Sequence, residues 1–225
     1  MTQSRVAEAA RSAGRSVDSV TLLAVSKGQS SAAIDSAANA GLEHFGENFV
    51  QEALPKMREL TGRELTWHFI GRLQANKTRP VAENFAWVHT IDRMKIAERL
   101  SSQRPYHAPA LNVCLQLNVG GETTKGGVES VGIRELASQV RTLPGLRLRG
   151  LMCMPPAESE VSRQRRWFHE ARQVFDYLNE HGFGLDTLSM GTSADFEAAI
   201  AEGATMVRIG TAIFGPRDTP APVGR

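Results

Sequence analysis

Short apolar runs alternate along the chain with longer stretches in which apolar residues recur at helical spacing. The helical spacing is clearest in Ile133, Leu136, Ala137 and Val140, which lie on one face of a helix. The runs typical of strands are 21–25, 44–46, 67–70, 87–90, 113–118, 148–152, 187–189 and 206–209. The stretches typical of helices are 31–40, 49–60, 77–84, 93–102, 130–142, 162–181 and 194–202, after a first short helix at 2–13.

Strands that alternate with helices predict a parallel sheet, because parallel neighbours need a crossover connection. Eight such units are the number that closes a (β/α)8 barrel. An open doubly wound sheet is the alternative, but segment 25–30 reads VSKGQS and lacks the G-x-G-x-x-G fingerprint. We therefore expect an α/β fold, a single (β/α)8 TIM barrel with an extra N-terminal helix. It would span residues 1–218 and leave a disordered tail at 219–225.

Charge and hydropathy exclude two classes of partner. Lysine and arginine together number 26 against 24 acidic residues, a formal net charge of +2. A dedicated nucleic-acid-binding protein needs a concentrated basic surface, so this charge argues against one. No apolar run reaches the ~18 residues of a membrane span, and the first residues lack the apolar core of a signal peptide. We expect a cytoplasmic protein that binds neither nucleic acid nor membrane.

Four residues in or beside the apolar runs are interpreted as core residues. Cys114 and Cys153 are expected as buried thiols rather than as a disulfide. Without clustered histidines they give no metal-ligand spacing, so no metal site is expected. His68 and His89 fall within predicted strands, where hydrogen-bonded core histidines are favoured over catalytic ones.

Lys27 is the first candidate for chemistry, because it directly follows the first predicted strand. Active sites of this barrel lie at the carboxyl ends of the strands. Desolvation there favours the neutral amine, and a neutral amine can attack an aldehyde. The alternative is a lysine that extends to solvent or pairs with a carboxylate.

The ends of the seventh and eighth strands favour phosphate binding. Gly191 with Ser193 and Gly210 with Thr211 each combine a glycine and a hydroxyl in a turn that precedes a predicted helix. Such turns bring the backbone and its N–H groups close to an anion, and this fold commonly binds phosphate there. Ser193 can alternatively be the N-cap of the helix at 194–202.

Arg208 and Asn48 are candidates for contact with a ring. Arg208 immediately precedes the second glycine turn, and a guanidinium beside a pyridine nitrogen keeps that nitrogen unprotonated. Pairing of Arg208 with a carboxylate is the alternative. Asn48 can hydrogen-bond a ring hydroxyl or cap the helix that begins at Phe49.

Four motifs resemble the pyridoxal phosphate homeostasis proteins, the YggS/PROSC family. They read LLAVSK at 22–27, HFGENFVQE at 44–52, WHFIG at 67–71 with LQANK at 73–77, and MVRIGTAIFG at 206–215. The resemblance covers about residues 15–218 and implies a barrel like the N-terminal domain of alanine racemase. It implies pyridoxal 5′-phosphate held as an internal aldimine on Lys27, with Asn48 at the ring and Arg208 near the pyridine nitrogen. The residues that it places around the phosphate are Ser189, Gly191, Ser193, Gly210 and Thr211.

Several positions beside the inferred site depart from the family pattern. Gly71-Arg72 replaces the usual Gly-Pro, Thr192 replaces a common Met, and segment 26–30 lacks a proline. Segment 125–127 reads KGG in place of the common Lys-Ser-Gly. Lys125 in this loop is a second candidate for a transient cofactor contact, with an exposed loop lysine as the alternative.

The resemblance implies a binding protein that holds and releases pyridoxal 5′-phosphate in intracellular homeostasis, without committed catalysis and with no catalytic residue assigned. A racemase needs an acid or base group on each face of the cofactor. The sequence closes just after the eighth strand, and we expect no second domain to supply one. The alternatives are a pyridoxal-phosphate-dependent amino-acid racemase and a Schiff-base aldolase acting on a phosphorylated sugar. The expected partners are the cofactor and apo-enzymes that use it, and the expected state is a monomer.

Overall fold

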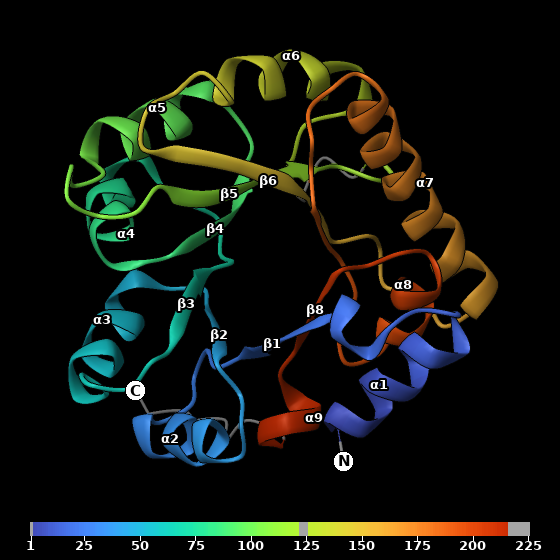
Figure 1. Ribbon diagram of the computed structural model, residues 1–225, viewed down its shortest axis with the longest axis horizontal. Helices are drawn as coiled ribbons and strands as arrows, with labels where there is room; N and C mark the ends of the chain where they lie inside the picture. The colour runs from blue at the N-terminus through green and yellow to red at the C-terminus, as the bar shows by residue number, and fades with distance from the viewer. Residues whose placement is uncertain (1, 122–125, 216–225) are drawn as a thin grey trace, which may run out of the picture.

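Parallel strands form a closed ring at the centre of the fold, with helices around it (Figure 1). The computed structural model describes residues 2–121 and 126–215. Each strand pairs with the next along the chain, and the last pairs with the first through Leu22 beside Val207. The strands are β1 (Thr21–Val25), β2 (His44–Glu47), β3 (Thr66–Phe69), β4 (Trp87–Ile91), β5 (Leu111–Leu117), β6 (Leu146–Cys153), β7 (Thr187–Ser189) and β8 (Met206–Ile209). The predicted α/β barrel is confirmed.

Helices follow the strands along the chain, and α1 precedes the first strand as predicted. The α-helices are α1 (Thr2–Ser12), α2 (Ser31–Asn39), α3 (Val50–Glu59), α4 (Thr78–Asn84), α5 (Met94–Gln103), α6 (Ser130–Val140), α7 (Val161–Glu180), α8 (Phe196–Ala201) and α9 (Thr211–Phe214). The 3-10 turns η1 (Val17–Ser19) and η2 (Ala75–Lys77) precede β1 and α4. The last residue of each described strand therefore lies at one end of the barrel, where the loops to the helices begin.

The main apolar core lies between the strands and the surrounding helices. Phe45 of β2 and Phe69 of β3 are buried in it, and so are Ile34 of α2 and Phe168 of α7. The periodic residues of segment 130–140 are all buried on one face of α6, as their spacing predicts. Burial of this apolar surface is the main contribution that favours the fold.

The two cysteines are buried free thiols, as predicted. Burial raises the pKa of Cys114 and of Cys153 to about 12, so both thiols stay protonated at neutral pH. Within residues 2–121 and 126–215, no three metal-ligating side chains gather in one place. In the same residues, no helix combines the length and apolar character needed to span a membrane.

Candidate functional site

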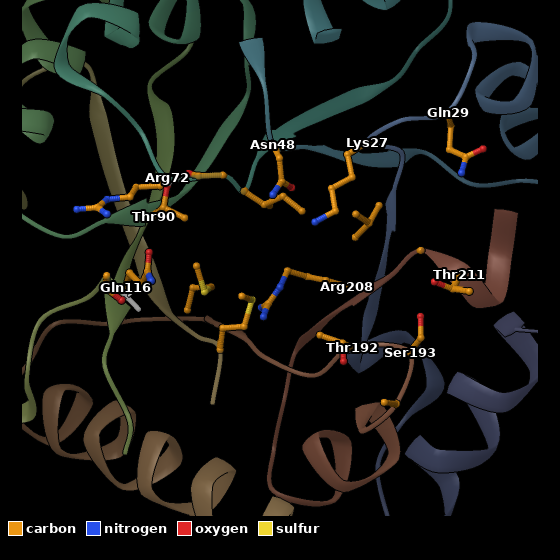
Figure 2. Close-up of a pocket in the computed structure, with 18 of the residues that line it drawn as sticks. Lys27, Gln29, Asn48, Arg72, Thr90, Gln116, Thr192, Ser193, Arg208 and Thr211 are labelled. Atoms are coloured by element: carbon orange, nitrogen blue, oxygen red, sulfur yellow. Dashed lines mark hydrogen bonds between the residues drawn. The ribbon is translucent and has the colours of Figure 1, made fainter. Parts of the chain in front are cut away.

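A cavity of about 510 Å³ lies at the carboxyl ends of the strands, within the usual range for small-molecule sites. Its lining includes six of the predicted site residues, which come from the ends of β1, β2 and β8 and from the loop after β7. Figure 2 shows Lys27 pointing into this cavity between Asn48 and Arg208. The six residues are Lys27, Asn48, Ser193, Arg208, Gly210 and Thr211.

The residues on both sides of Lys27 are held by hydrogen bonds to and from charged side chains. Before it, Ser26 donates through Oγ to Glu47 Oε1 at 2.6 Å, and its carbonyl accepts from Lys56 Nζ at 3.0 Å. After it, the Gly28 N–H donates to Glu52 Oε2 at 3.2 Å. Lys27 itself is half-buried. These bonds fix the end of β1 and thereby direct the Lys27 side chain.

Glu47 and Lys56 form a buried ion pair beneath this strand end. Lys56 Nζ donates to Glu47 Oε1 at 2.8 Å, and Glu47 is fully buried. Burial raises the pKa of Glu47, although the hydrogen bonds from Lys56 and Ser26 act in the opposite direction. The second carboxylate oxygen, Oε2, is buried without a hydrogen-bond partner. Sequence reasoning missed this pair; the signal was that Lys56 is one of only five lysines in the chain.

Arg208 is buried and makes three hydrogen bonds to neutral oxygen atoms. Its Nη1 donates to the Ser189 carbonyl at 2.7 Å and to Ser189 Oγ at 2.9 Å, and Nη2 donates to the Cys153 carbonyl at 2.9 Å. Burial lowers the pKa of Arg208, yet a guanidinium stays protonated in proteins. None of these three bonds joins Arg208 to a carboxylate, which was the alternative expected from the sequence. Arg208 therefore brings a positive charge and further N–H donors to the cavity.

Asn48 carries a buried amide oxygen, Oδ1, that has no hydrogen-bond partner among the described residues. The alternative role of Asn48 as a helix cap is wrong, because Phe49 is the N-cap of α3 and makes no side-chain cap bond. The loop after β3 approaches closely: a Cβ on Gly71 would lie 2.1 Å from the Asn48 carbonyl oxygen. Only glycine fits at position 71, and its approach closes one side of the cavity around Asn48.

The turns after β7 and β8 bring hydroxyl groups to the same side of the cavity (Figure 2). Ser193 is not the N-cap of α8; Asp195 is, and its Oδ1 accepts hydrogen bonds from the Thr192 N–H and Oγ at 2.6 and 2.8 Å. Ser193 makes no hydrogen bond to another described residue, so its hydroxyl is available to a ligand. Thr211 is exposed at the start of α9.

Ser189 and Gly191 lie behind the lining of the cavity. Ser189 is fully buried, and its Oγ bonds to Arg208 and to His89. Gly191 has φ of +92°, and a Cβ there would lie 2.6 Å from the Cβ of Ala199. Lys125 lies outside the described residues, as does the expected tail at 219–225.

Other residues of the lining escaped the sequence prediction. Arg72, at the position that departs from the family pattern, lines the cavity and is exposed. Thr90 Oγ donates to the Gly71 carbonyl at 2.6 Å, and Gln116 lies beyond it (Figure 2). Arg72 and Gln116 could have been predicted from their positions, because both lie at or just after the end of a strand.

His68 and His89 are buried and hydrogen-bonded inside the barrel. Burial lowers the pKa of His68 well below its ordinary value, with His89 and His44 acting in the same direction. Burial, Arg208 and His44 lower the pKa of His89 to about 3. Both imidazoles are therefore neutral at physiological pH.

These lowered values predict that the free energy of unfolding falls as the pH drops below 6.5. In the unfolded chain His89 takes a proton near pH 6.5, whereas in the folded chain it stays neutral to about pH 3. The unfolded state thus binds more protons in this window, at up to about 1.4 kcal/mol per pH unit for each such histidine. Urea denaturation at a series of pH values measures this slope.

The variant His89→Gln is the matched control, because glutamine does not titrate and the slope should become shallower. Glu47, with its raised pKa, acts in the opposite sense from pH 4.5 upward, and the control leaves that contribution unchanged. A stability that rises as the pH falls from 6.5 towards 5, or the same slope in the variant, contradicts the prediction.

The class of protein follows from the fold and its matches. Residues 3–218 match the family model of the N-terminal domain of alanine racemase. The alanine racemase of Corynebacterium glutamicum has the same fold: the TM-score is 0.73 at 17% identity, over 99% of this chain and 62% of that one. The barrel is therefore of the alanine racemase N-terminal type.

Closer relatives define the family. The pyridoxal phosphate homeostasis protein of Pseudomonas aeruginosa is 56% identical over 218 residues, 97% of this chain and 94% of that protein. The protein of that name in Escherichia coli K12 is 53% identical over 220 residues, 95% and 93% of the two chains. PipY of Synechococcus elongatus, solved with PLP bound and without it, is 40% identical, with TM-scores of 0.80 and 0.82, over 88% of this chain and 93% of PipY. The chain belongs to the family of pyridoxal phosphate homeostasis proteins.

Proposed function

We propose that the protein binds pyridoxal 5′-phosphate in the cavity, holds it on Lys27 and releases it, as part of intracellular pyridoxal phosphate homeostasis. The names of its relatives and the PLP-bound structure of PipY support this function. The observation in this chain that carries it is a half-buried lysine that points into a cavity (Figure 2).

The residues of the cavity fit this cofactor. When bound, pyridoxal phosphate supplies an aldehyde to which an amine attaches covalently with loss of water. Asn48 Oδ1 is a buried acceptor without a partner, and a ligand hydroxyl supplies the donor that it lacks. Arg208 offers only donors, which suit a ring nitrogen that stays unprotonated. Ser193 and Thr211, with the backbone at Gly210, would hold the phosphate.

We also propose that the protein performs no committed catalysis. Racemisation requires an acid or base group on each face of the cofactor. Among the described residues of the lining, the ionisable side chains are Lys27, Arg72 and Arg208. Because a guanidinium is not deprotonated near neutral pH, Lys27 alone among these described lining residues can serve as such a group. The described part of the lining thus offers one acid or base side chain where a racemase needs two.

Titration with pyridoxal phosphate, followed by transfer, tests this function. We expect a visible absorption band that grows to one cofactor per chain and disappears when an apo-enzyme that needs the cofactor is added. The apo-enzyme should gain activity in parallel, and alanine or another amino acid should not be racemised. A colourless protein, or racemisation at ordinary enzyme rates of about 1–1000 s⁻¹, contradicts the proposal. The monomeric state, the cytoplasmic location and the apo-enzyme partners stay predictions.

A further inference from the structure

A line of hydrogen-bonded side chains crosses the inside of the barrel and ends at Arg208. His44 Nδ1 lies 3.0 Å from His68 Nε2, and His68 Nδ1 lies 2.9 Å from His89 Nε2. His89 Nδ1 lies 3.0 Å from Ser189 Oγ, which lies 2.9 Å from Arg208 Nη1. We name His44, His68, His89 and Ser189 the histidine chain, which ends on Arg208. Since β4 and β7 are not neighbours in the sheet, the contact between His89 and Ser189 spans the barrel interior.

Such an interior is unusual, because branched apolar side chains normally fill the inside of this barrel. His68, His89, Ser189 and Arg208 are all buried there. A buried polar group without a partner is costly, whereas a fully paired network defines one arrangement of its members. The histidine chain pairs both ring nitrogens of His68 and of His89.

Arg208 determines which partner is the donor in each hydrogen bond of the histidine chain. A guanidinium has donors and no acceptor, so Ser189 Oγ accepts the hydrogen bond from Arg208. Among the described residues, the remaining partner of that hydroxyl is His89 Nδ1. Because a buried O–H without an acceptor is costly, the Ser189 O–H donates to His89 Nδ1, and the neutral His89 ring carries its proton on Nε2.

The same order continues to the other end of the chain. His89 Nε2–H donates to His68 Nδ1, and His68 Nε2–H donates to His44 Nδ1. His44 is half-buried, so its own Nε2–H lies at the end nearer to solvent. The Nδ1 atom of each histidine already accepts a hydrogen bond. A proton added to any of these atoms would leave two hydrogen-bond donors facing each other. Burial acts in the same direction, since it lowers the pKa of all three imidazoles.

The groups that pack against the imidazole rings in the middle of the histidine chain are uncharged. The Trp87 ring stacks on His68 at a centroid distance of 5.3 Å and an angle of 12°. The thiols of Cys114 and Cys153 stay protonated, because burial raises the pKa of each to about 12. Glu43 is the acidic group that acts on His44, and Arg208 is the cation that acts on His89.

We propose that the histidine chain is a positioning device for Arg208. It holds the guanidinium at the cavity through a hydrogen bond that Arg208 donates to Ser189. Because the histidines stay neutral, no second positive charge forms beside Arg208 inside the barrel. Two backbone carbonyls also hold Arg208, but only Ser189 Oγ connects it to the histidines. The use of this device rests on the proposed function, in which Arg208 faces the ring nitrogen of pyridoxal phosphate.

Nitrogen-15 NMR of the imidazoles in the ligand-free protein tests the proton order directly. We expect His68 and His89 to be neutral, with the proton on Nε2, and to show no titration around pH 6.5, where an ordinary histidine titrates. A proton on Nδ1 of either ring, or titration of either ring in that range, overturns the proposal. This measurement uses the unmodified protein and needs no cofactor.

The variant Ser189→Ala separates positioning from packing. It removes the hydroxyl and leaves both carbonyl bonds of Arg208 in place. We expect part of the His89 protons to move to Nδ1 and the cofactor to dissociate about tenfold faster, since a hydrogen bond to a charged group is lost. Ser189→Thr, which keeps a hydroxyl, should restore the Nε2 proton. Ser36→Ala is the control, because its hydroxyl bond lies on the exposed face of α2.

The outcomes distinguish this inference from the proposed function. Imidazole protons that stay on Nε2 in Ser189→Ala overturn the directing role, even where the variant is less stable. If the NMR is as expected and the protein takes up no pyridoxal phosphate, the proposed function fails and the histidine chain stands. If the cofactor binds to Lys27 and the rings titrate, the reverse holds.

Discussion

Lys27→Ala is expected to lose the visible absorption band that the wild-type protein gives with pyridoxal phosphate. Alanine cannot form the covalent attachment, so only the contacts from Arg208, Asn48 and the hydroxyls of the turns remain. We expect the apparent affinity to fall at least about tenfold, which corresponds to ~1.4 kcal/mol. Absorbance titration measures the band, and equilibrium dialysis measures the remaining binding.

Lys95→Ala is the matched control for this variant. Lys95 lies on the exposed side of α5, away from the cavity lining, so its removal should leave the band and the affinity unchanged. Urea denaturation of both variants checks that the fold is intact. A Lys27→Ala protein that stays yellow and binds the cofactor as tightly as wild type removes Lys27 from the proposed role.

Lys56→Met is expected to destabilise the fold by about 3–5 kcal/mol, because it leaves the Glu47 carboxylate buried without its counter-ion. The pKa of Glu47, already raised by burial, should rise further. The same substitution frees the Ser26 carbonyl, which accepts from Lys56 Nζ at 3.0 Å. Release of the cofactor from the neighbouring Lys27 should therefore be faster. Chemical denaturation and the decay of the absorption band after dilution measure the two effects.

Arg79→Met is the matched control for Lys56→Met, because it removes the cation of an exposed ion pair instead of a buried one. Arg79 Nη1 lies 3.7 Å from Glu83 Oε1 on the surface of α4, where the loss of one partner should cost no more than about 1 kcal/mol. In the double variant Glu47→Leu with Lys56→Met, neither charge of this ion pair remains, and part of the lost stability should return. Equal, small effects of Lys56→Met and Arg79→Met would refute the structural role assigned to the buried pair.

The architecture could be predicted because each strand of the barrel contains buried residues and lies in a short run rich in apolar residues. Few parallel-sheet folds other than this barrel are compatible with eight apolar runs that alternate with helical stretches. The boundaries were less accurate: β5 begins at Leu111, two residues before the predicted run, and β6 is longer at both ends than 148–152. Pairing between β5 and β6 extends over Leu111–Leu117, and hydrogen bonding to a neighbouring strand is not visible in the local pattern.

Part of the site could be predicted because its residues follow directly from the strand ends. Helix caps could not: the sequence offered Ser193 and Asn48, whereas the structure uses Asp195 and Phe49. Each cap depends on where the first helical turn begins, a position that local propensity leaves uncertain by a few residues.

The supporting contacts could not be read from the sequence either, because they join distant segments. Lys56 reaches Ser26 across 30 residues, and His89 reaches Ser189 across 100. Pairing of β1 with β2 brings the first pair together, and closure of the barrel brings the second. The interpretation of His68 and His89 as hydrogen-bonded core residues agrees with their contacts, while their connection to Arg208 emerged from the three-dimensional arrangement.

Borohydride reduction of the cofactor-loaded protein, followed by peptide mapping, tests the central claim most directly. Reduction makes a covalent attachment permanent and bleaches the yellow colour. The protein has five lysines, so the modified peptide identifies the attachment site without ambiguity. We expect the reduced cofactor on the peptide that contains Lys27 and on no other. Labelling of Lys56, Lys77, Lys95 or Lys125 in its place, or a loaded protein with no covalent label, would contradict the account.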